Sequence, residues 1–305
     1  MSRSILFAAL SLLVGCTFNV TSFTADAPIS TAPTNPTRLS GDFSGLANLQ
    51  GFGVRVEGSA STLTTSATVT VGGLLQSGVD PSTVTRGVHI DWPLDASDAT
   101  ARRLTIGYDG PALETVWTEG VTVSLPSTTA LDLVGGSTSL EVDGVTGPIH
   151  LVVDSGSLAV TGAGDFVLEA TSGSIDVQGH AGSATCTSGS VALDLTGAIV
   201  AGASSGSIGG RFGGGGTLST TSGSIDVELV GPLDRDLTLS ATSGSIHLTV
   251  PVGTAMRVET HTGSGSSHVH AGGIDSNDDI ATPMGSGAFL VHATAGSGSI
   301  AITER

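Results

Sequence analysis

Apolar and polar residues alternate with a period of two through much of the chain, most regularly between residues 131 and 303. The alternation surrounds a recurring Ser-Gly-Ser tripeptide, with apolar residues five and three positions before its glycine and two and four positions after it. Because successive side chains of a β-strand point to opposite faces, this pattern is typical of strands with one buried face. It therefore predicts two β-strands around each tripeptide, with the glycine at the bend between them.

The Ser-Gly-Ser tripeptide recurs at a nearly constant interval. The first five copies follow one another at 16 or 17 residues, and the next two at 21. A short fixed period is typical of a solenoid, in which each copy forms one turn and the stacked turns share a core. We therefore predict an all-β fold, a β-solenoid with turns of about 17–21 residues. At the bends, glycine tolerates positive φ and the serines can bond backbone groups. The repeat glycines are Gly156, Gly173, Gly189, Gly206, Gly223, Gly244, Gly265 and Gly298.

The pattern divides the chain into four regions. Residues 1–15 have the features of an export signal, and residues 16–40 are a Thr/Ser/Pro-rich stretch that we expect to be a tether. Residues 41–133 carry less regular strand signals, interpreted as a β cap over the open end of the solenoid. Residues 134–305 hold the regular turns, with an inserted loop or degenerate turn at 271–287. Strands in the cap region are predicted at 54–57, 67–71, 88–92, 104–108, 115–118 and 121–125.

The N-terminus resembles that of an exported bacterial lipoprotein. Arg3 precedes a short apolar run, residues 5–14, which suits a signal peptide and is too short to span a bilayer. The run ends in Leu-Val-Gly-Cys, which resembles a lipobox and implies that Cys16 is lipidated. We therefore expect a protein anchored in the cell envelope, by default at the outer membrane, because Thr17 is not the Asp that retains some lipoproteins at the inner membrane. The alternative is an ordinary signal peptide that contains a cysteine.

Composition and charge narrow the classes of partner. The chain carries 45 glycines, no lysine and a formal net charge of −17, and only 4% of its residues are aromatic. An acidic surface repels phosphate backbones, so nucleic acid is not expected as a partner. The other cysteine, Cys186, falls at an inward position, where we expect a buried thiol rather than a nucleophile or a metal ligand.

Two segments around the repeat carry a resemblance to a known family. The sequences Val-Thr-Val-Ser-Leu-Pro at 121–126 and His-Leu-Thr-Val-Pro-Val-Gly at 247–253, together with the repeat, resemble a bacterial family of β-strand-repeat domains named for a suspected role in adhesion. The resemblance covers roughly residues 41–305 and is strongest from residue 121 onward. It implies an envelope-associated β-solenoid of unknown function, and it brings no catalytic residue with it.

One candidate metal site follows from the predicted register. The third residue after the glycine points outward, and in three successive turns it is Asp226, His247 and His268. Stacked turns would place these side chains in one column about 5 Å apart, a ligand set that suits zinc or copper. No other cofactor is expected. The acidic residues at 275–279 offer oxygen ligands for calcium, but their spacing fits a solvated acidic loop better than a calcium-binding loop.

The sequence favours a function without catalysis. We expect a lipid-anchored rod of the cell envelope with a structural or adhesive role and an unidentified protein or glycan partner. The alternative is a carbohydrate-active enzyme or a glycan-binding module on a β-helix scaffold. Such an enzyme needs a cleft lined by aromatic, basic and paired acidic groups. The regular turns instead present mainly Ser, Thr and Gly outward.

Overall fold

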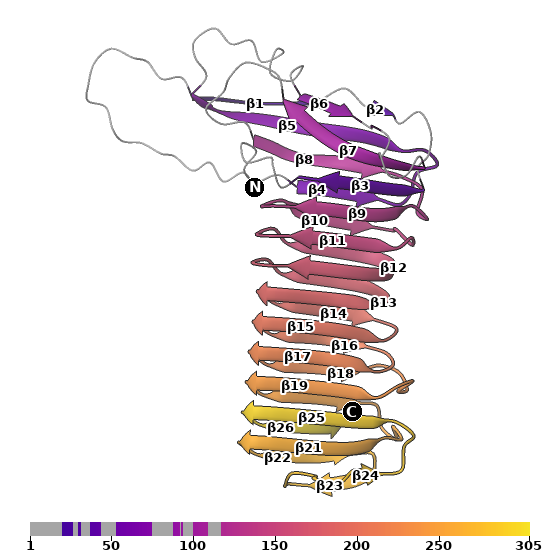
Figure 1. Ribbon diagram of the computed structural model, residues 1–305, viewed down its shortest axis with the longest axis vertical. Helices are drawn as coiled ribbons and strands as arrows, with labels where there is room; N and C mark the ends of the chain where they lie inside the picture. The colour runs from indigo at the N-terminus through magenta and orange to yellow at the C-terminus, as the bar shows by residue number, and fades with distance from the viewer. Residues whose placement is uncertain are drawn as a thin grey trace, which may run out of the picture.

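The computed structural model describes residues 20–26, 30–31, 37–43, 53–74, 88–91, 93, 100–108 and 117–305. These residues form a rod of stacked β-coils, with an additional layer of strands over one end (Figure 1). The predicted signal peptide, residues 1–15, and the predicted lipidation site, Cys16, lie outside the described residues. Among the residues that are described, no helix is long and apolar enough to cross a membrane.

The strands fall into an irregular N-terminal group and a regular series. The first group consists of β1 (Val20–Asp26), β2 (Ser30–Thr31), β3 (Arg38–Asp42), β4 (Gly53–Glu57), β5 (Thr64–Leu74), β6 (Val88–Asp91), β7 (Ala101–Tyr108) and β8 (Trp117–Ser124). The series begins with β9 (Ala130–Gly135), β10 (Ser139–Asp143), β11 (Ile149–Val153), β12 (Leu158–Ala170), β13 (Ile175–Ser188), β14 (Val191–Leu195), β15 (Ile199–Ser205), β16 (Ile208–Phe212) and β17 (Gly216–Ser222). It ends with β18 (Ile225–Leu229), β19 (Leu237–Ser243), β20 (Ile246–Val250), β21 (Arg257–Ser264), β22 (Ser267–Ala271), β23 (Ile274–Ser276), β24 (Met284–Gly285), β25 (Leu290–Ser297) and β26 (Ile300–Glu304).

Two parallel sheets form the walls of the rod, and each coil contributes one strand to each sheet. The first sheet runs in space through β7, β3, β9, β11, the second halves of β12 and β13, β15, β17, β19, β25 and β21. The second sheet runs through β8, β4, β10, the first halves of β12 and β13, β14, β16, β18, β20, β26 and β22. Each Ser-Gly-Ser makes the bend from the first sheet to the second, which confirms the predicted β-solenoid.

The core lies between the two sheets and is continuous along the rod. The inward positions predicted from the alternation are buried: Ile175, Val191 and Ile246 are each 1% exposed and Ile225 is 0% exposed. Burying a side chain of this size contributes roughly 1.5–3 kcal/mol to the free energy of folding. Because every coil adds the same pair of inward rows, the hydrophobic stabilisation accumulates along the rod rather than within any one coil.

The repeat glycines are required because the backbones of successive coils lie in close contact at the bends. A β-carbon at Gly206 would lie 1.7 Å from the carbonyl oxygen of Gly189, and one at Gly223 would lie 1.9 Å from that of Gly206. Positive φ, the reason expected from the sequence, occurs at only three repeat glycines, with values between 150° and 159°. The dominant constraint is therefore the close approach of two backbones. The three glycines with positive φ are Gly244, Gly265 and Gly298.

The repeat serines link one bend to the next, as predicted. The backbone N–H of Ser224 donates to the Oγ of Ser207 at 3.3 Å, and the N–H of Ser245 donates to the Oγ of Ser224 at 3.3 Å. The N–H of Ser299 donates in the same way to the Oγ of Ser245 at 3.2 Å. The side chains at the bends thus extend the hydrogen-bond ladders of the two sheets along this edge of the rod.

The coils do not follow one another in chain order at either end of the rod. The coil β3–β4 lies between the coils β7–β8 and β9–β10. At the other end, the coil β25–β26 lies between the coils β19–β20 and β21–β22, as the yellow strands in Figure 1 show. Regular parallel stacking therefore includes residues that the sequence assigned to the irregular cap.

Two of the predicted regions contain strands that the sequence did not predict. Part of the stretch 16–40, interpreted as a tether, forms strands: β1 and β2 pair antiparallel with β5, and β3 begins at Arg38 inside the stack. Residues 20–26 read Val-Thr-Ser-Phe-Thr-Ala-Asp, and their β-branched and aromatic residues favour a strand. The segment 271–287, interpreted as a loop or degenerate turn, forms the short strands β23 and β24, which pair with β22 and β21.

Replacing a repeat glycine by alanine tests the close contact between coils. We expect Gly206→Ala to lower the free energy of unfolding by about 1–3 kcal/mol, because the new methyl group overlaps backbone atoms that cannot move independently. The matched control is Gly202→Ala, where the nearest atom to a β-carbon is 3.6 Å away and a change within about 0.5 kcal/mol is expected. Urea unfolding of both variants gives the comparison; equal effects would contradict the account.

Candidate functional site

The three residues of the predicted metal column are not brought together. Asp226 and His247 do pair across β18 and β20, with 3.2 Å between Oδ1 and Nδ1. Ala301 of β26 occupies the next position after His247, however, and separates it from His268. The Nδ1 of His268 instead lies 2.7 Å from the Oδ1 of Asn277. The prediction that the three stack in successive coils is therefore wrong, because the last coil of the chain is inserted between two of them.

Most histidines sit next to a carboxylate of a neighbouring strand or loop. Of the seven histidines whose side chains the structure describes, six lie within 3.9 Å of an Asp or Glu. Within that part of the chain, no three His, Cys, Asp or Glu side chains gather in a cluster that could hold a metal ion. The pairs are His150–Asp132, His180–Asp165, His247–Asp226, His261–Asp279, His270–Asp275 and His292–Glu259.

In one of these pairs the imidazole also contacts a hydroxyl group, an arrangement that could not be seen in the sequence. The Nε2 of His292 lies 3.2 Å from the Oγ1 of Thr294, and its Nδ1 lies 3.6 Å from Glu259. Glu259 and His292 are distant in the chain and meet only because β25 pairs with β21. Hydroxyl, imidazole and carboxylate are the groups of a nucleophilic triad. The backbone amides of β25 bond to strands on both sides, however, so they are not free to stabilise an oxyanion.

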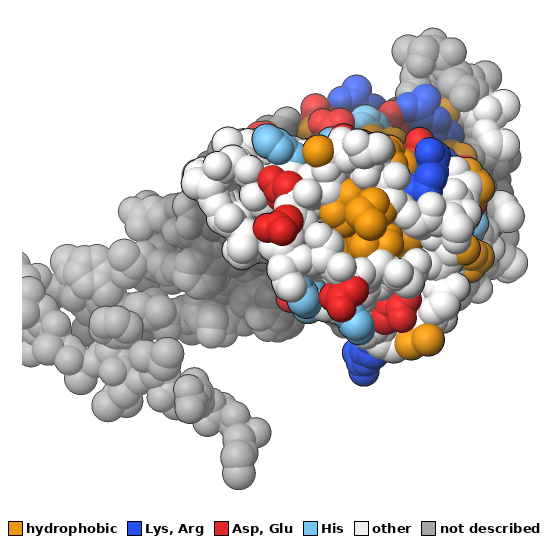
Figure 2. Space-filling model, turned by 90° about the horizontal axis from the view of Figure 1, so that it is seen from below, with side chains coloured by type: hydrophobic (Ala, Val, Ile, Leu, Met, Phe, Trp, Pro, Cys, Tyr) orange, Lys and Arg blue, Asp and Glu red, His pale blue; other side chains and the backbone are white. Residues whose placement is uncertain are grey.

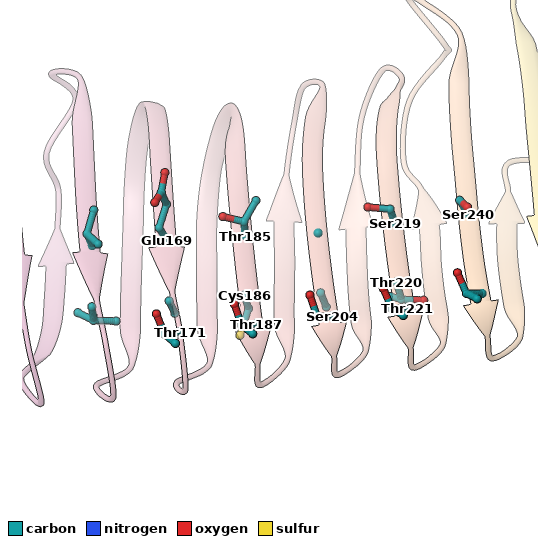
Figure 3. Close-up of a pocket in the computed structure, with 16 residues that line it drawn as sticks. Glu169, Thr171, Thr185, Cys186, Thr187, Ser204, Ser219, Thr220, Thr221 and Ser240 are labelled. Atoms are coloured by element: carbon teal, nitrogen blue, oxygen red, sulfur yellow. The ribbon is translucent and has the colours of Figure 1, made fainter.

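The candidate site with the most regular lining is a shallow trough on the outer face of the first sheet (Figure 3). It has a volume of about 450 Å³, crosses β12, β13, β15, β17 and β19, and ends at Val152 and Val153 of β11. Two rows of small, mostly hydroxyl-bearing side chains line it, and we call this surface the hydroxyl trough. One row consists of Glu169, Thr185, Gly202, Ser219 and Ser240, and the other of Thr171, Thr187, Ser204, Thr221 and Thr242.

The position of each row follows from the repeat. The two rows stand four and two residues before the bend glycine, so both point away from the core. Neighbouring side chains in a row are separated by the spacing between strands, about 4.8 Å, and the two rows by about 6.6 Å. The preference for Ser and Thr at these positions is visible in the sequence. The sequence alone did not mark these rows as a site, because Ser and Thr face outward throughout the regular turns.

The residues between the two rows point inward and are small. Ala170 and Ala203 are 6% and 5% exposed, and Cys186 is 4% exposed. The Cys186 thiol donates to the carbonyl oxygen of Gly173 at 2.9 Å, and burial raises the pKa of the thiol above its usual value. The inward Thr220 likewise donates its hydroxyl to the carbonyl oxygen of Gly223 at 2.9 Å. Cys186 is therefore a buried core residue, as predicted. The polar side chains beneath the trough have their hydrogen-bond partners within the protein and are not directed at a ligand.

A second depression, of about 570 Å³, lies on the edge of the rod opposite the Ser-Gly-Ser bends. Asp165, His180, Asp234 and Arg235 lie around it, with Val200 exposed on its surface. A side-chain hydrogen bond from Arg235 holds the pKa of the Asp234 carboxyl below its usual value, and Asp234 also accepts from the backbone N–H of Gly215 at 3.1 Å. The charged groups of this depression are thus paired with one another, whereas the hydroxyl trough presents a more uniform surface of hydroxyl groups.

Charged side chains on the second sheet act mainly as links between coils. Arg211 donates two hydrogen bonds to Asp194, at 2.7 and 2.9 Å, and Gln178 adds a third at 3.2 Å. The hydrogen bond from Arg211 is the largest cause that lowers the pKa of the Asp194 carboxyl. These side chains come from β13, β14 and β16, three neighbouring strands of the second sheet. The outer face of this sheet therefore carries charged side chains that pair between strands, unlike the hydroxyl trough.

Comparison with known proteins identifies a family. The chain matches the Toastrack DUF4097 family over residues 114–303. Among curated proteins, none matches.

Several solved structures are similar to the chain at low identity. A candidate lipid-binding protein from Parabacteroides distasonis ATCC 8503 is 13% identical, with a TM-score of 0.43, over 92% of this chain and 96% of that one. A candidate adhesin from Parabacteroides merdae ATCC 43184 is 12% identical, with a TM-score of 0.37, over 92% and 95%. A candidate cell adhesion protein from Clostridium sporogenes ATCC 15579 is 9% identical, with a TM-score of 0.23, over 94% and 100%. These likenesses carry no information about the ligand.

Proposed function

The chain belongs to the Toastrack DUF4097 family, and we propose that it acts without catalysis, as a lipid-anchored rod of the bacterial cell envelope that makes adhesive contacts through the hydroxyl trough. The observation that supports this proposal is the trough itself, in which five neighbouring strands repeat the same two outward positions and eight of the ten residues there bear a hydroxyl. A regular row of donors and acceptors suits a partner that is itself regular, such as a glycan chain or a repetitive protein surface. Each hydrogen bond contributes little, about 0.5–1.5 kcal/mol, so binding requires many of them in register.

The geometry of the rod supports a role in presentation. The stacked coils number about eleven, and at ~4.8 Å between strands they span roughly 50 Å. Lipidation at Cys16 would hold this rod at the membrane, by default the outer membrane, and leave the trough facing sideways along its length. Export and anchoring rest on the lipobox at residues 13–16 and on the preceding apolar run. The partner is a glycan or a protein, since the net charge of −17 disfavours nucleic acid.

The alternative of a carbohydrate-active enzyme has one observation in its favour, the arrangement of Glu259, His292 and Thr294. That arrangement lies outside the hydroxyl trough. A glycan array followed by an assay for newly released reducing ends separates the two functions. Binding without release supports the adhesive role, and release that disappears in His292→Ala supports the enzyme.

Replacing Cys16 tests the anchor. In cells that produce the full-length protein, we expect the wild type to incorporate labelled fatty acid and to sediment with the membrane fraction. The Cys16→Ala variant has no thiol for the lipid, so it should lose the label and leave the membrane fraction. Cys186→Ala is the matched control and should keep both properties, because this thiol is buried in the core. A labelled, membrane-bound Cys16→Ala variant would overturn the anchor.

Adding charge and bulk to the hydroxyl trough tests the contact surface. We expect Thr187→Arg combined with Ser219→Arg to weaken binding of the purified protein to immobilised envelope fragments or arrayed glycans at least tenfold, by blocking the trough. Thr161→Arg combined with Thr249→Arg, on the outer face of the second sheet, adds the same charge and should leave binding unchanged. Equal binding by both double variants, measured by biolayer interferometry, would contradict an adhesive role for the trough.

A further inference from the structure

The last coil of the chain is not the last coil of the rod. On the first sheet, β25 pairs with β19 on one side and with β21 on the other. On the second sheet, β26 pairs in the same way with β20 and β22. The bend between them is held from both sides as well: the N–H of Ile246 donates to the carbonyl oxygen of Ser299 at 2.9 Å, and the N–H of Ile300 donates to that of Ser266 at 2.9 Å. The C-terminal segment therefore fills a slot between two other coils.

The first coil of the stack in the sequence has the same arrangement at the opposite end. β3 and β4 are inserted between the coil β7–β8 and the coil β9–β10. Ion pairs reinforce the contact: Arg38 bonds to Asp132 of β9, and Arg55 donates to Glu141 of β10 at 2.7 Å. Hydrogen bonds to Glu57 and attraction to the neighbouring carboxylates raise the pKa of the Arg55 guanidinium. At each end of the solenoid, the coil that comes first or last in the chain is thus the second coil of the stack, and another coil covers it.

The sequence explains why the coil β21–β22 lies outermost at the C-terminal end. Two of its inward positions hold hydroxyl groups, at Thr260 (1% exposed) and Ser267 (3% exposed). Ser267 donates to Thr260 at 2.9 Å, and Thr260 accepts from the backbone N–H of Ile280 at 3.0 Å. Ile280 belongs to the segment that covers the end of the rod, so these hydroxyls are fully satisfied only beneath that cover. The corresponding inward residues of β25 and β26 are apolar: Ala293, Ala295, Ile300 and Ile302.

The outer edge of this coil is itself covered. Arg257 and Val258 pair with β24, and Val269, His270 and Ala271 pair with β23. Between these pairs, the N–H of Thr260 donates to the carbonyl oxygen of Ile280 at 3.1 Å, and the N–H of Thr262 donates to the carboxylate of Asp279 at 2.8 Å. Seen from this end, charged and polar side chains surround a small apolar centre (Figure 2). The end of the rod therefore offers few free backbone groups to a further coil.

We propose that the two inserted coils, β3–β4 and β25–β26, are locks that prevent the rod from unravelling from the ends of its chain. In a solenoid stacked in chain order, the terminal coil is bonded on one side only and separates first. Here the terminal coil is bonded on both sides, so it separates only after the outer coil and its cover have separated or after two ladders break together. The lock is independent of what the hydroxyl trough binds.

Amide hydrogen exchange of the intact protein, followed by mass spectrometry, tests the locks directly. Peptides from β25 and β26 should exchange at least tenfold more slowly than peptides from β21 and β22, although they end the chain. By the same reasoning, β3 should exchange more slowly than β7. Exchange in β25 and β26 that is as fast as in β21 and β22, or faster, would overturn the proposal.

A truncated chain tests whether the slot is specific. The variant that ends at Ala288 lacks the lock, and we expect residues 257–271 to lose their protection from exchange while the coils up to β20 keep theirs. A synthetic peptide of residues 286–305 should restore the protection of 257–271, whereas the same peptide with Ile300→Asp and Ile302→Asp should not. Full protection of 257–271 without any peptide, or no recovery with the natural peptide, would contradict the lock.

Discussion

The structure depends on how closely the backbones of successive coils approach one another at the Ser-Gly-Ser bends. A β-carbon at Gly173 would lie 1.6 Å from the carbonyl oxygen of Gly156, and the same conflict recurs at each bend along the rod. Only glycine permits this contact, and the contact sets the register in which both sheets add their strands. The register in turn aligns the inward rows into one core and the outward Ser and Thr residues into two rows. The core and the candidate binding surface thus have one common cause.

The local structure of the regular region could be predicted from the sequence, because a period of two with one buried face has a single structural solution. The rows that contain Ile175, Val191, Ile225 and Ile246 were assigned to the core from the alternation alone, and all four are buried. The role of the repeat glycines was predicted only in part. Positive φ is a property of one residue, whereas close approach depends on a second coil whose position the local sequence does not give.

The order of the coils could not be predicted in the same way. Parallel ladders are formed by backbone groups, and every coil offers the same alternation, so neighbouring coils are almost interchangeable. The assumption that the coils stack in chain order led to the wrong column of Asp226, His247 and His268. The outermost coil is distinguished by two inward hydroxyls, Thr260 and Ser267, that bond to each other and to the covering segment. In the sequence they look no different from Thr220, an inward hydroxyl of a middle coil that bonds within its own bend. The role of the two hydroxyls depends on Ile280, whose backbone N–H donates to Thr260 and which lies far from both of them in the local sequence pattern.

Cross-linking of paired cysteines tests the order of the coils most directly. Residues in register on adjacent strands lie about 4.8 Å apart, within the range that a disulfide spans, whereas residues two coils apart lie about 9.6 Å apart, beyond it. The account predicts that His247→Cys combined with Ala301→Cys forms a disulfide under mild oxidation, and that His247→Cys combined with His268→Cys does not. A disulfide between positions 247 and 268, with none between 247 and 301, would show that the coils stack in chain order and would contradict the account.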